Sequence, residues 1–182
     1  MAKEDRRIQK SRDAIETAFL ELLMKNGIEQ ITINDIADRA NVNRGTVYLH
    51  YKDKYDLFAH CIDTKLAGLQ KLCDSIMEDQ EPDEMKRAFL QIYQYLAADY
   101  GFFSTMLNNQ GTPYFQEKFK KMIIKEMDKN LTDKKSKMNR EFSRQCKSAA
   151  LTGVVEWWLR AGMPLSAEEM ADNTLQLCLI YA

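Results

Sequence analysis

Glycine and proline are scarce in this chain of 182 residues, which contains seven and three of them respectively. Both residue types are frequent in turns, and a chain with so few of them is not expected to form many hairpins. The scarcity therefore favours an all-helical fold. Hydrophobic residues make up 45% of the chain and charged residues 29%, a mixture typical of a soluble globular protein.

An excess of positive charge is also missing, because the formal net charge is −1. This excludes a protein that coats nucleic acid through its overall charge, so any contact with DNA must use a local basic patch. Long apolar runs are absent as well, and we expect no membrane span. The N-terminal sequence MAKEDRRIQKSRDA lacks the apolar segment of a signal peptide, which predicts a cytoplasmic protein.

Cysteine and histidine show no motif that carries chemistry. The four cysteines are far apart in sequence: Cys61, Cys73, Cys146 and Cys178. In a reducing compartment we expect buried thiols, and without a CxxC pair or a Cys/His cluster we expect no metal site and no cofactor. Ser/His/Asp, Glu-x-x-His and Gly-rich phosphate motifs are also absent, so an enzyme is not expected.

Apolar residues at helical spacing begin early in the chain. Ile15, Phe19 and Leu22 share one face of a helix that is predicted from about Ile8 to Asn26. The polar segment before it, residues 1–9, is expected to be frayed. It carries several basic residues, which indicate either a solvated tail or an arm that touches DNA phosphates or the minor groove.

Residues 31–57 predict two short helices joined by a tight polar turn. Thr32 is predicted as the N-cap of the first helix, because its hydroxyl can accept a backbone N–H. Asp35, three residues on, can reach back to the N-cap or favour the positive end of the helix. Asn41 ends the first helix, because asparagine tolerates the left-handed conformation. The second helix, Arg44 to Tyr51, has only about two turns. A short helix with an exposed N-terminal end is typical of one that reads the major groove of DNA.

Side chains around this second helix have the chemistry to bind DNA. Arg44 is the expected base reader, since a guanidinium pairs with O6 and N7 of guanine for about 1–3 kcal/mol of discrimination; the alternative is a contact with phosphate only. Tyr48, His50 and Lys54 can donate to phosphates, although Tyr48 could instead pack in the core and Lys54 could be a solvated charge. The full expected DNA-binding set is Thr32, Asn34, Asn43, Arg44, Gly45, Thr46, Tyr48, Leu49, His50 and Lys54.

A long helix is predicted from Lys54 to about Asp79, and further helices at about 83–100, 102–107, 113–131 and 138–161. Ser166 and Glu169 form a capping-box pattern, which opens the final helix. That final helix is apolar around most of its circumference. The helix before it carries small residues at three- and four-residue steps, and both features indicate an interface. The expected interface residues are Phe142, Cys146, Ala149, Ala150, Gly153, Trp157, Leu177, Cys178 and Tyr181.

Aromatic and methionine side chains in the C-terminal half are candidates for a ligand pocket, although such side chains at helical spacing more often form core. The candidate effector-pocket residues are Tyr93, Leu96, Tyr100, Phe103, Met106, Phe119 and Trp157. Tyrosine hydroxyls inside a helical core need partners, which favours a polar cavity.

Residues 8–57 resemble the DNA-binding domain of TetR-family transcriptional regulators. The matching features are Ile31-Thr32, Asp35-Ile36-Ala37 and the run NRGTVYLHYKDKYDL that begins at Asn43. Asn41 stands where the family usually has glycine. The segment WWLRAGMPLS, which begins at Trp157, looks like the C-terminal end of a subgroup found mainly in Firmicutes, to which the dihydroxyacetone-kinase activator DhaS is related.

The resemblance implies an all-α protein of about nine helices. It would have a three-helix helix-turn-helix domain at residues 1–55 and a dimerisation and effector domain at residues 56–182. It also implies a homodimeric repressor that binds a palindromic operator on double-stranded DNA and is released when an effector tilts the fourth helix. The alternative is a regulator whose C-terminal domain binds a protein partner, as a DhaS-like activator would, instead of a small molecule.

Overall fold

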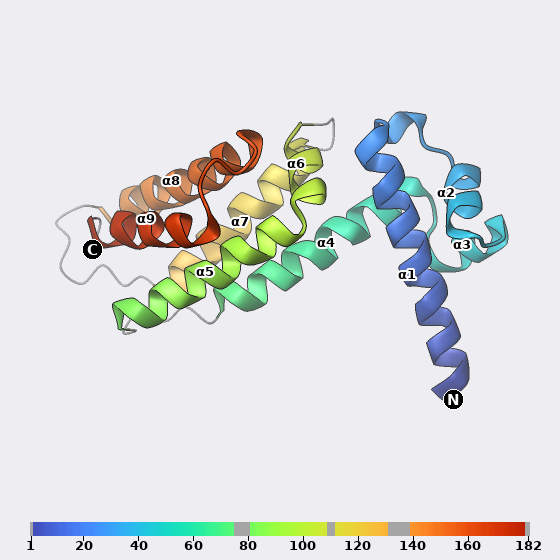
Figure 1. The fold of residues 1–182 in the computed structure, drawn as a ribbon, viewed down its shortest axis with the longest axis horizontal. Coiled ribbons are helices and arrows are strands. Elements are labelled where there is room, and N and C mark those ends of the chain that lie inside the picture. Colours follow the sequence, from blue (N-terminus) through green and yellow to red (C-terminus); the bar gives the residue numbers. More distant parts are fainter. Residues whose placement is uncertain (1, 75–80, 109–111, 131–138, 181–182) are drawn as a thin grey trace. The chain divides into compact units, whose positions relative to one another are not determined.

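The computed structural model describes residues 2–74, 81–108, 112–130 and 139–180. This described part is built from helices and short connections, without a β-strand (Figure 1). The elements are α1 (Ala2–Lys25), η1 (Ile28–Gln30), α2 (Ile33–Ala40), α3 (Arg44–His50), α4 (Lys54–Cys73), α5 (Pro82–Ala98), α6 (Tyr100–Asn108), α7 (Thr112–Asn130), α8 (Arg140–Arg160) and α9 (Ala167–Ile180). The all-helical fold predicted from the sequence is confirmed. Within the described ranges, no helix is both long and apolar enough to span a membrane.

The chain divides into two compact units, residues 1–65 (unit 1) and residues 66–108 with 112–182 (unit 2). The division lies inside α4, between Lys65 and Leu66, ten residues after the predicted boundary. The start of α4 belongs to unit 1 because its apolar side chains complete that core. Phe58, for example, packs edge-on against Phe19 of α1, with the ring centroids 6.3 Å apart.

The core of unit 1 takes apolar residues from every α-helix that it contains. The side chains buried there include Ile15, Phe19, Ile36, Val47, Leu57 and Ile62. Between α2 and α3, Asn41 adopts the left-handed conformation, with φ 53° and ψ 47°, as the sequence predicts. Asn43 occupies the N-cap position of α3, but its side chain makes no capping hydrogen bond.

Unit 2 is organised around α5, which packs along α9, while α8 packs on α6 and α7. Tyr93 of α5 meets Trp158 of α8 edge-on at 5.3 Å between centroids. Phe102 and Phe103 of α6 are buried in the same unit, as is Phe115 of α7. The second part of α4 joins this unit through Gly68, because a Cβ on Gly68 would collide with the ring of Tyr95. Glycine therefore permits a close approach between α4 and α5.

The turn between α8 and α9 holds two successive left-handed residues, Gly162 with φ 78° and Met163 with φ 57°. Trp158 donates its indole N–H to the carbonyl of Leu165 at 2.8 Å, which ties the turn to α8. The predicted capping box then opens α9. The Ser166 N–H donates to Glu169 at 2.7 Å, and the Glu169 N–H donates to the Ser166 hydroxyl at 3.1 Å.

Three predictions about local structure were wrong in part. The first helix begins at Ala2 rather than Ile8, so residues 2–9 are helical; lysine, arginine, glutamate and glutamine all have high helix propensity. The fourth helix ends at Cys73, and residues 75–79 of its predicted extent lie outside the described residues. Cys61 is buried as expected, but Cys146 is exposed and Cys73 and Cys178 are half-buried.

Candidate nucleic-acid interface

The short helix α3 separates its side chains into a buried side and an exposed side. Val47 is completely buried, whereas Arg44, Gly45, Tyr48 and Leu49 are exposed. At about 100° per residue, these four positions span an arc of about 140° on one side of the helix. Thr46 and His50 flank Val47 and are half-buried. These four exposed residues therefore form one continuous solvent-facing side of α3.

Arg44 is held on this exposed face by Tyr48, one turn further along α3. The guanidinium Nη2 donates to the Tyr48 hydroxyl at 3.1 Å, and Cζ lies 5.4 Å from the centre of the Tyr48 ring. A guanidinium carries five N–H donors, so this bond engages one of them and leaves the others for further partners. The contact restricts the rotamers of Arg44 without burying its charge.

The N-terminus of α2 is occupied by the side chain of Asp35. The Thr32 N–H donates to the Asp35 carboxylate at 2.8 Å, the Thr32 hydroxyl donates to the same oxygen at 2.7 Å, and the Asp35 N–H donates back to that hydroxyl at 3.2 Å. These bonds lower the pKa of Asp35, with the hydroxyl as the largest cause. A phosphate contact by Thr32 therefore requires an exchange of partners. Asn34 is exposed beside it.

Lys54 braces the connection before α2. Its ammonium donates to the carbonyls of Glu29 and Ile31, both at 3.1 Å, and lies 5.3 Å from the centre of the Tyr55 ring. The Tyr55 hydroxyl donates to the Glu29 carboxylate at 2.9 Å, and this bond is the main cause of a raised Tyr55 pKa. With two of its three donors engaged, Lys54 keeps one N–H for another partner.

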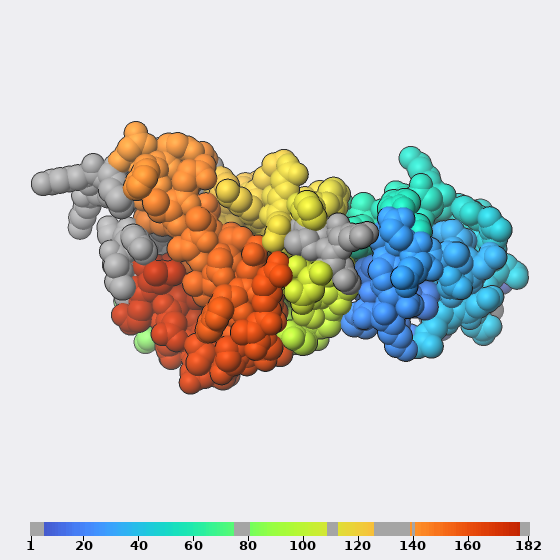
Figure 2. Space-filling model, turned by 90° about the horizontal axis from the view of Figure 1, so that it is seen from above, coloured from blue at the N-terminus to red at the C-terminus, as the bar shows by residue number. Residues whose placement is uncertain are grey.

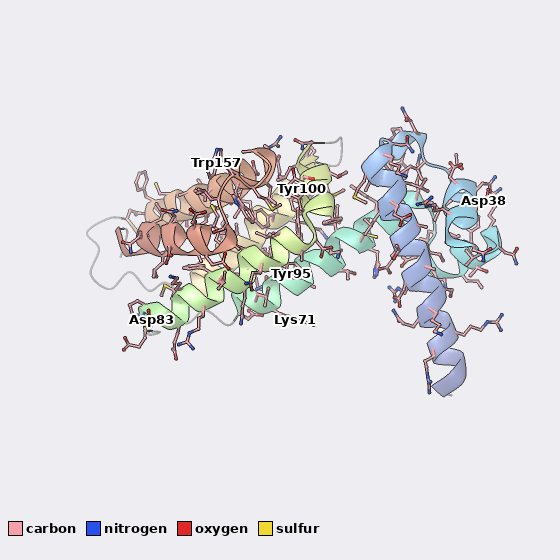
Figure 3. The ribbon with its side chains drawn as sticks, viewed as in Figure 1. Asp38, Lys71, Asp83, Tyr95, Tyr100 and Trp157 are labelled. Atoms are coloured by element: carbon pink, nitrogen blue, oxygen red, sulfur yellow. The ribbon has the colours of Figure 1, made fainter. Side chains whose placement is uncertain are left out.

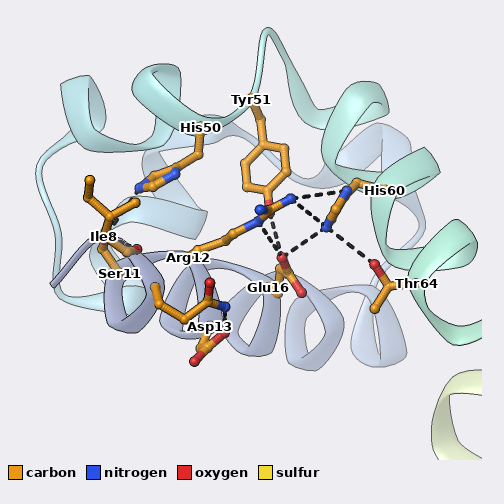
Figure 4. A network of polar contacts seen from close by, with 10 residues as sticks. Ile8, Ser11, Arg12, Asp13, Glu16, His50, Tyr51, His60 and Thr64 are labelled. Atoms are coloured by element: carbon orange, nitrogen blue, oxygen red, sulfur yellow. Dashed lines mark hydrogen bonds and ion pairs between the residues drawn. The ribbon is translucent and has the colours of Figure 1, made fainter. Parts of the chain in front are cut away.

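A network of polar side chains joins the end of α3 to α1 and α4 (Figure 4). Tyr51 is buried, and its hydroxyl donates to Glu16 at 2.6 Å and accepts from Arg12 Nε at 3.2 Å. Arg12 Nη2 also lies 2.9 Å from Nε2 of His60, which is itself 3.2 Å from the Glu16 carboxylate. Burial, and then the bond to Glu16, raise the pKa of Tyr51.

Sequence reasoning missed this network, although it fixes the helix that carries the candidate interface. Its only local signal was the i,i+4 pair of Arg12 and Glu16. His50, a predicted phosphate donor, lies next to the network, and its Nε2 is 3.0 Å from the hydroxyl of Ser11. His50 therefore has a partner on α1 within unit 1.

The predicted effector-pocket residues divide by burial. Tyr93, Leu96, Phe103, Met106 and Phe119 are buried and Tyr100 is half-buried, whereas Trp157 is 51% exposed. Figure 3 labels Trp157 on α8 and Tyr100 on α6. The Tyr93 hydroxyl is already paired with Thr174 at 2.6 Å. The five buried members of this set are all core residues of unit 2.

The predicted interface residues of α8 lie along one exposed stripe of the helix. Phe142 is 61% exposed, Cys146, Ala149 and Gly153 are exposed, and Ala150 is half-buried. Atoms of α8 and α9 together occupy a face of unit 2 (Figure 2). On α9, Leu177 and Cys178 are half-buried, and Tyr181 lies outside the described residues.

Two family models match the chain. "Bacterial regulatory proteins, tetR family" matches residues 15–61, and "Transcriptional regulator C-terminal region" matches residues 83–179, more than half of the chain. Among solved structures, the chain is similar to the dihydroxyacetone kinase operon activator DhaS, with a TM-score of 0.69 and 20% identity over 93% of this chain and 94% of that one. It is also similar to a TetR transcriptional regulator from Streptococcus agalactiae 2603V, with a TM-score of 0.71 and 24% identity over 97% of each chain. These likenesses support the fold.

Curated relatives agree with the family models. The chain is 24% identical over 168 residues to an uncharacterized HTH-type transcriptional regulator, YxbF, of Bacillus subtilis (strain 168), which covers 90% of this chain and 43% of the relative. It is 46% identical over 46 residues to a probable acrEF/envCD operon repressor of Escherichia coli (strain K12), or 25% of this chain and 20% of that protein. The chain thus spans less than half the length of either relative. It belongs to the TetR family of transcriptional regulators and carries that family's helix-turn-helix DNA-binding domain.

Proposed function

We propose that this TetR-family regulator acts as a cytoplasmic homodimer that binds a palindromic operator and represses transcription until an effector releases it. One observation carries the DNA part of the proposal. Arg44, Gly45, Tyr48 and Leu49 share the exposed side of α3, while Val47 anchors the opposite side in the core. A helix fixed in this way can enter the major groove as a rigid element.

The roles follow from the chemistry and the contacts. Arg44 reads guanine, with Tyr48 holding its guanidinium and donating to a phosphate. Gly45 lets the backbone approach the groove because it has no side chain, and the space beside it is open, with nothing within 4 Å of a Cβ built there. The remaining candidates contact phosphates or base edges from the flanks of α2, α3 and α4: Thr32, Asn34, Asn43, Thr46, Leu49, His50 and Lys54.

The α8 stripe supports a homodimer. Phe142 and Trp157 place large apolar surface in water, which is costly unless a partner covers it. Gly153 lies between them, and a Cβ there would meet nothing within 4 Å, so a second helix has room to approach. We propose that α8 and α9 of two chains form the interface through Phe142, Cys146, Ala149, Ala150, Gly153, Trp157, Leu177, Cys178 and Tyr181.

Two effector classes remain as candidates. A small molecule would occupy a pocket formed among Tyr93, Leu96, Tyr100, Phe103, Met106, Phe119 and Trp157. The second candidate is a protein partner, and one observation favours it. The aromatic rings of α6 and α7 already pack on one another, with Phe103 and Phe115 centroids 6.1 Å apart, and Tyr93 has Thr174 as its hydrogen-bond partner.

The test of DNA binding uses fluorescence anisotropy with labelled duplexes that contain the palindromes upstream of the protein's own gene. The dissociation constant should rise steeply with salt, by about a thousandfold or more between 50 and 200 mM if six or more phosphates are contacted. Binding that does not respond to salt would contradict the phosphate contacts.

Sedimentation velocity tests the dimer. The wild-type chain should sediment as a dimer, and Gly153→Leu should shift it toward monomer. Gly27→Leu is the matched control, because a side chain at Gly27 of unit 1 also meets nothing within 4 Å. A monomeric wild type, or equal effects of the two variants, would argue against the α8 interface.

A further inference from the structure

Among the side chains that the structure describes, Leu49 is the most exposed large apolar one, with 84% of its area accessible. Val47, two residues earlier, is completely buried and packs α3 against the apolar core of unit 1. Leu49 contributes nothing to that core. A single exposed leucine is common on protein surfaces, so its position relative to Arg44 decides what it can do.

Arg44 and Leu49 lie at the two edges of the exposed side of α3. At about 100° per residue they are about 140° apart around the helix, with Tyr48 and Gly45 between them. Five residues at 1.5 Å each separate them by about 7.5 Å along the axis of α3. This length is comparable to about two base-pair steps of 3.4 Å along DNA. Gly45 lies in the middle of the arc and adds no side chain that would keep Leu49 away from a base edge.

The two side chains differ in what they can recognise. A guanidinium binds the acceptors of guanine, whereas a leucine has no donor or acceptor. The 5-methyl group of thymine is the apolar feature that base pairs present in the major groove. We propose that Leu49 recognises a thymine methyl group in each operator half-site, about two base pairs from the pair that Arg44 contacts. This inference rests on the proposed function as an operator-binding dimer.

The experiment has two steps. Wild-type protein first selects sites from a pool of duplexes with a randomised core. Each thymine of the enriched site is then replaced in turn by deoxyuridine, which lacks only the methyl group. At one thymine per half-site the replacement should weaken wild-type binding about fourfold, the factor that corresponds to about 0.8 kcal/mol for one buried methyl group.

Leu49→Ala should bind the thymine and deoxyuridine sites equally and close to the wild-type affinity for the deoxyuridine site. Met24→Ala is the matched control, since Met24 is also apolar and 49% exposed but lies on α1; this variant should keep the wild-type preference for thymine.

The possible failures are distinct. If the pool yields no palindrome for wild-type protein, the proposed function fails and the inference with it. If a palindrome is enriched but wild-type binding tolerates deoxyuridine everywhere, or Leu49→Ala keeps the preference for thymine, only the inference is overturned.

Discussion

The hydroxyl of Tyr93 lies 2.6 Å from the hydroxyl of Thr174, and this hydrogen bond joins α5 to α9 across 81 positions of sequence. Both side chains are almost completely buried. Burial raises the pKa of Tyr93, so the phenol stays neutral at ordinary pH and can donate or accept in this bond. The same ring packs on Trp158, so Tyr93 links α5 to two helices of unit 2.

Tyr93→Phe should lower the free energy of unfolding by about 1–2 kcal/mol, because the Thr174 hydroxyl is then left buried without its partner. Thr174→Val in the same chain should recover part of that loss, since it removes the orphaned hydroxyl. Urea denaturation of the two single variants and the double variant measures the coupling. Strictly additive losses would mean that the bond contributes nothing to stability.

Tyr51→Phe should show a pH-dependent effect on stability. Because the pKa of Tyr51 is raised in the folded protein, the folded protein keeps the phenolic proton where the unfolded chain, with a pKa of about 10, has released it. The stabilisation is therefore complete below about pH 10 and is lost as the pH rises toward the raised pKa. The difference in unfolding free energy between wild type and Tyr51→Phe should be constant from pH 7 to 9 and shrink by pH 11. A difference that grows with pH would contradict the network.

The four cysteines should differ in their reaction with iodoacetamide. Burial, aided by the charge of Glu16, raises the pKa of Cys61 to about 12, so this thiol should stay unmodified at pH 8 until the protein unfolds. Cys146 is exposed on α8, so it should react in dilute protein and be protected at high concentration if α8 forms the dimer interface. Peptide mass mapping reads each site. Reactivity of Cys146 that is the same at all concentrations would count against that interface.

Substitutions of Arg44 and Lys54 should have separate effects, one on sequence preference in DNA binding and the other on the stability of the fold. Lys54→Met removes two hydrogen bonds to backbone carbonyls and should lower the unfolding free energy by about 1 kcal/mol while weakening all sites equally. Arg44→Ala should leave stability unchanged and flatten the preference between operator and mutated operator. Thermal unfolding and competition binding give the two readouts, and the opposite ranking would refute Arg44 as the base reader.

Local features of this fold were readable from the sequence, whereas contacts between distant residues were not. The caps of Thr32 with Asp35 and Ser166 with Glu169 depend on residues three positions apart, so the spacing predicted the second capping box and gave the first as one of two roles for Asp35. The contact of Tyr51 with Glu16 joins residues 35 positions apart, and no periodic pattern in the sequence indicates it.

Prediction from sequence spacing also failed where the same residue type can take either of two structural roles. Lys54 has the charge to bind a phosphate, but its bonds to main-chain carbonyls 23 and 25 positions away depend on the fold. Cys146 was predicted both as a buried thiol and as an interface residue, because it follows an apolar helical pattern. That pattern marks an exposed stripe of α8 instead, and periodicity alone does not tell a core face from an interface.

The division of α3 into an anchoring side and an exposed side has a consequence for how such regulators diverge. Substitutions at Arg44 or Leu49 change no buried contact, whereas Val47 and Tyr51 are held by the core. On the proposal that this exposed side reads the operator, one copy could acquire a new operator after a gene duplication through one or two replacements there. Its folding would be conserved throughout, so no compensating change elsewhere in the chain would be needed.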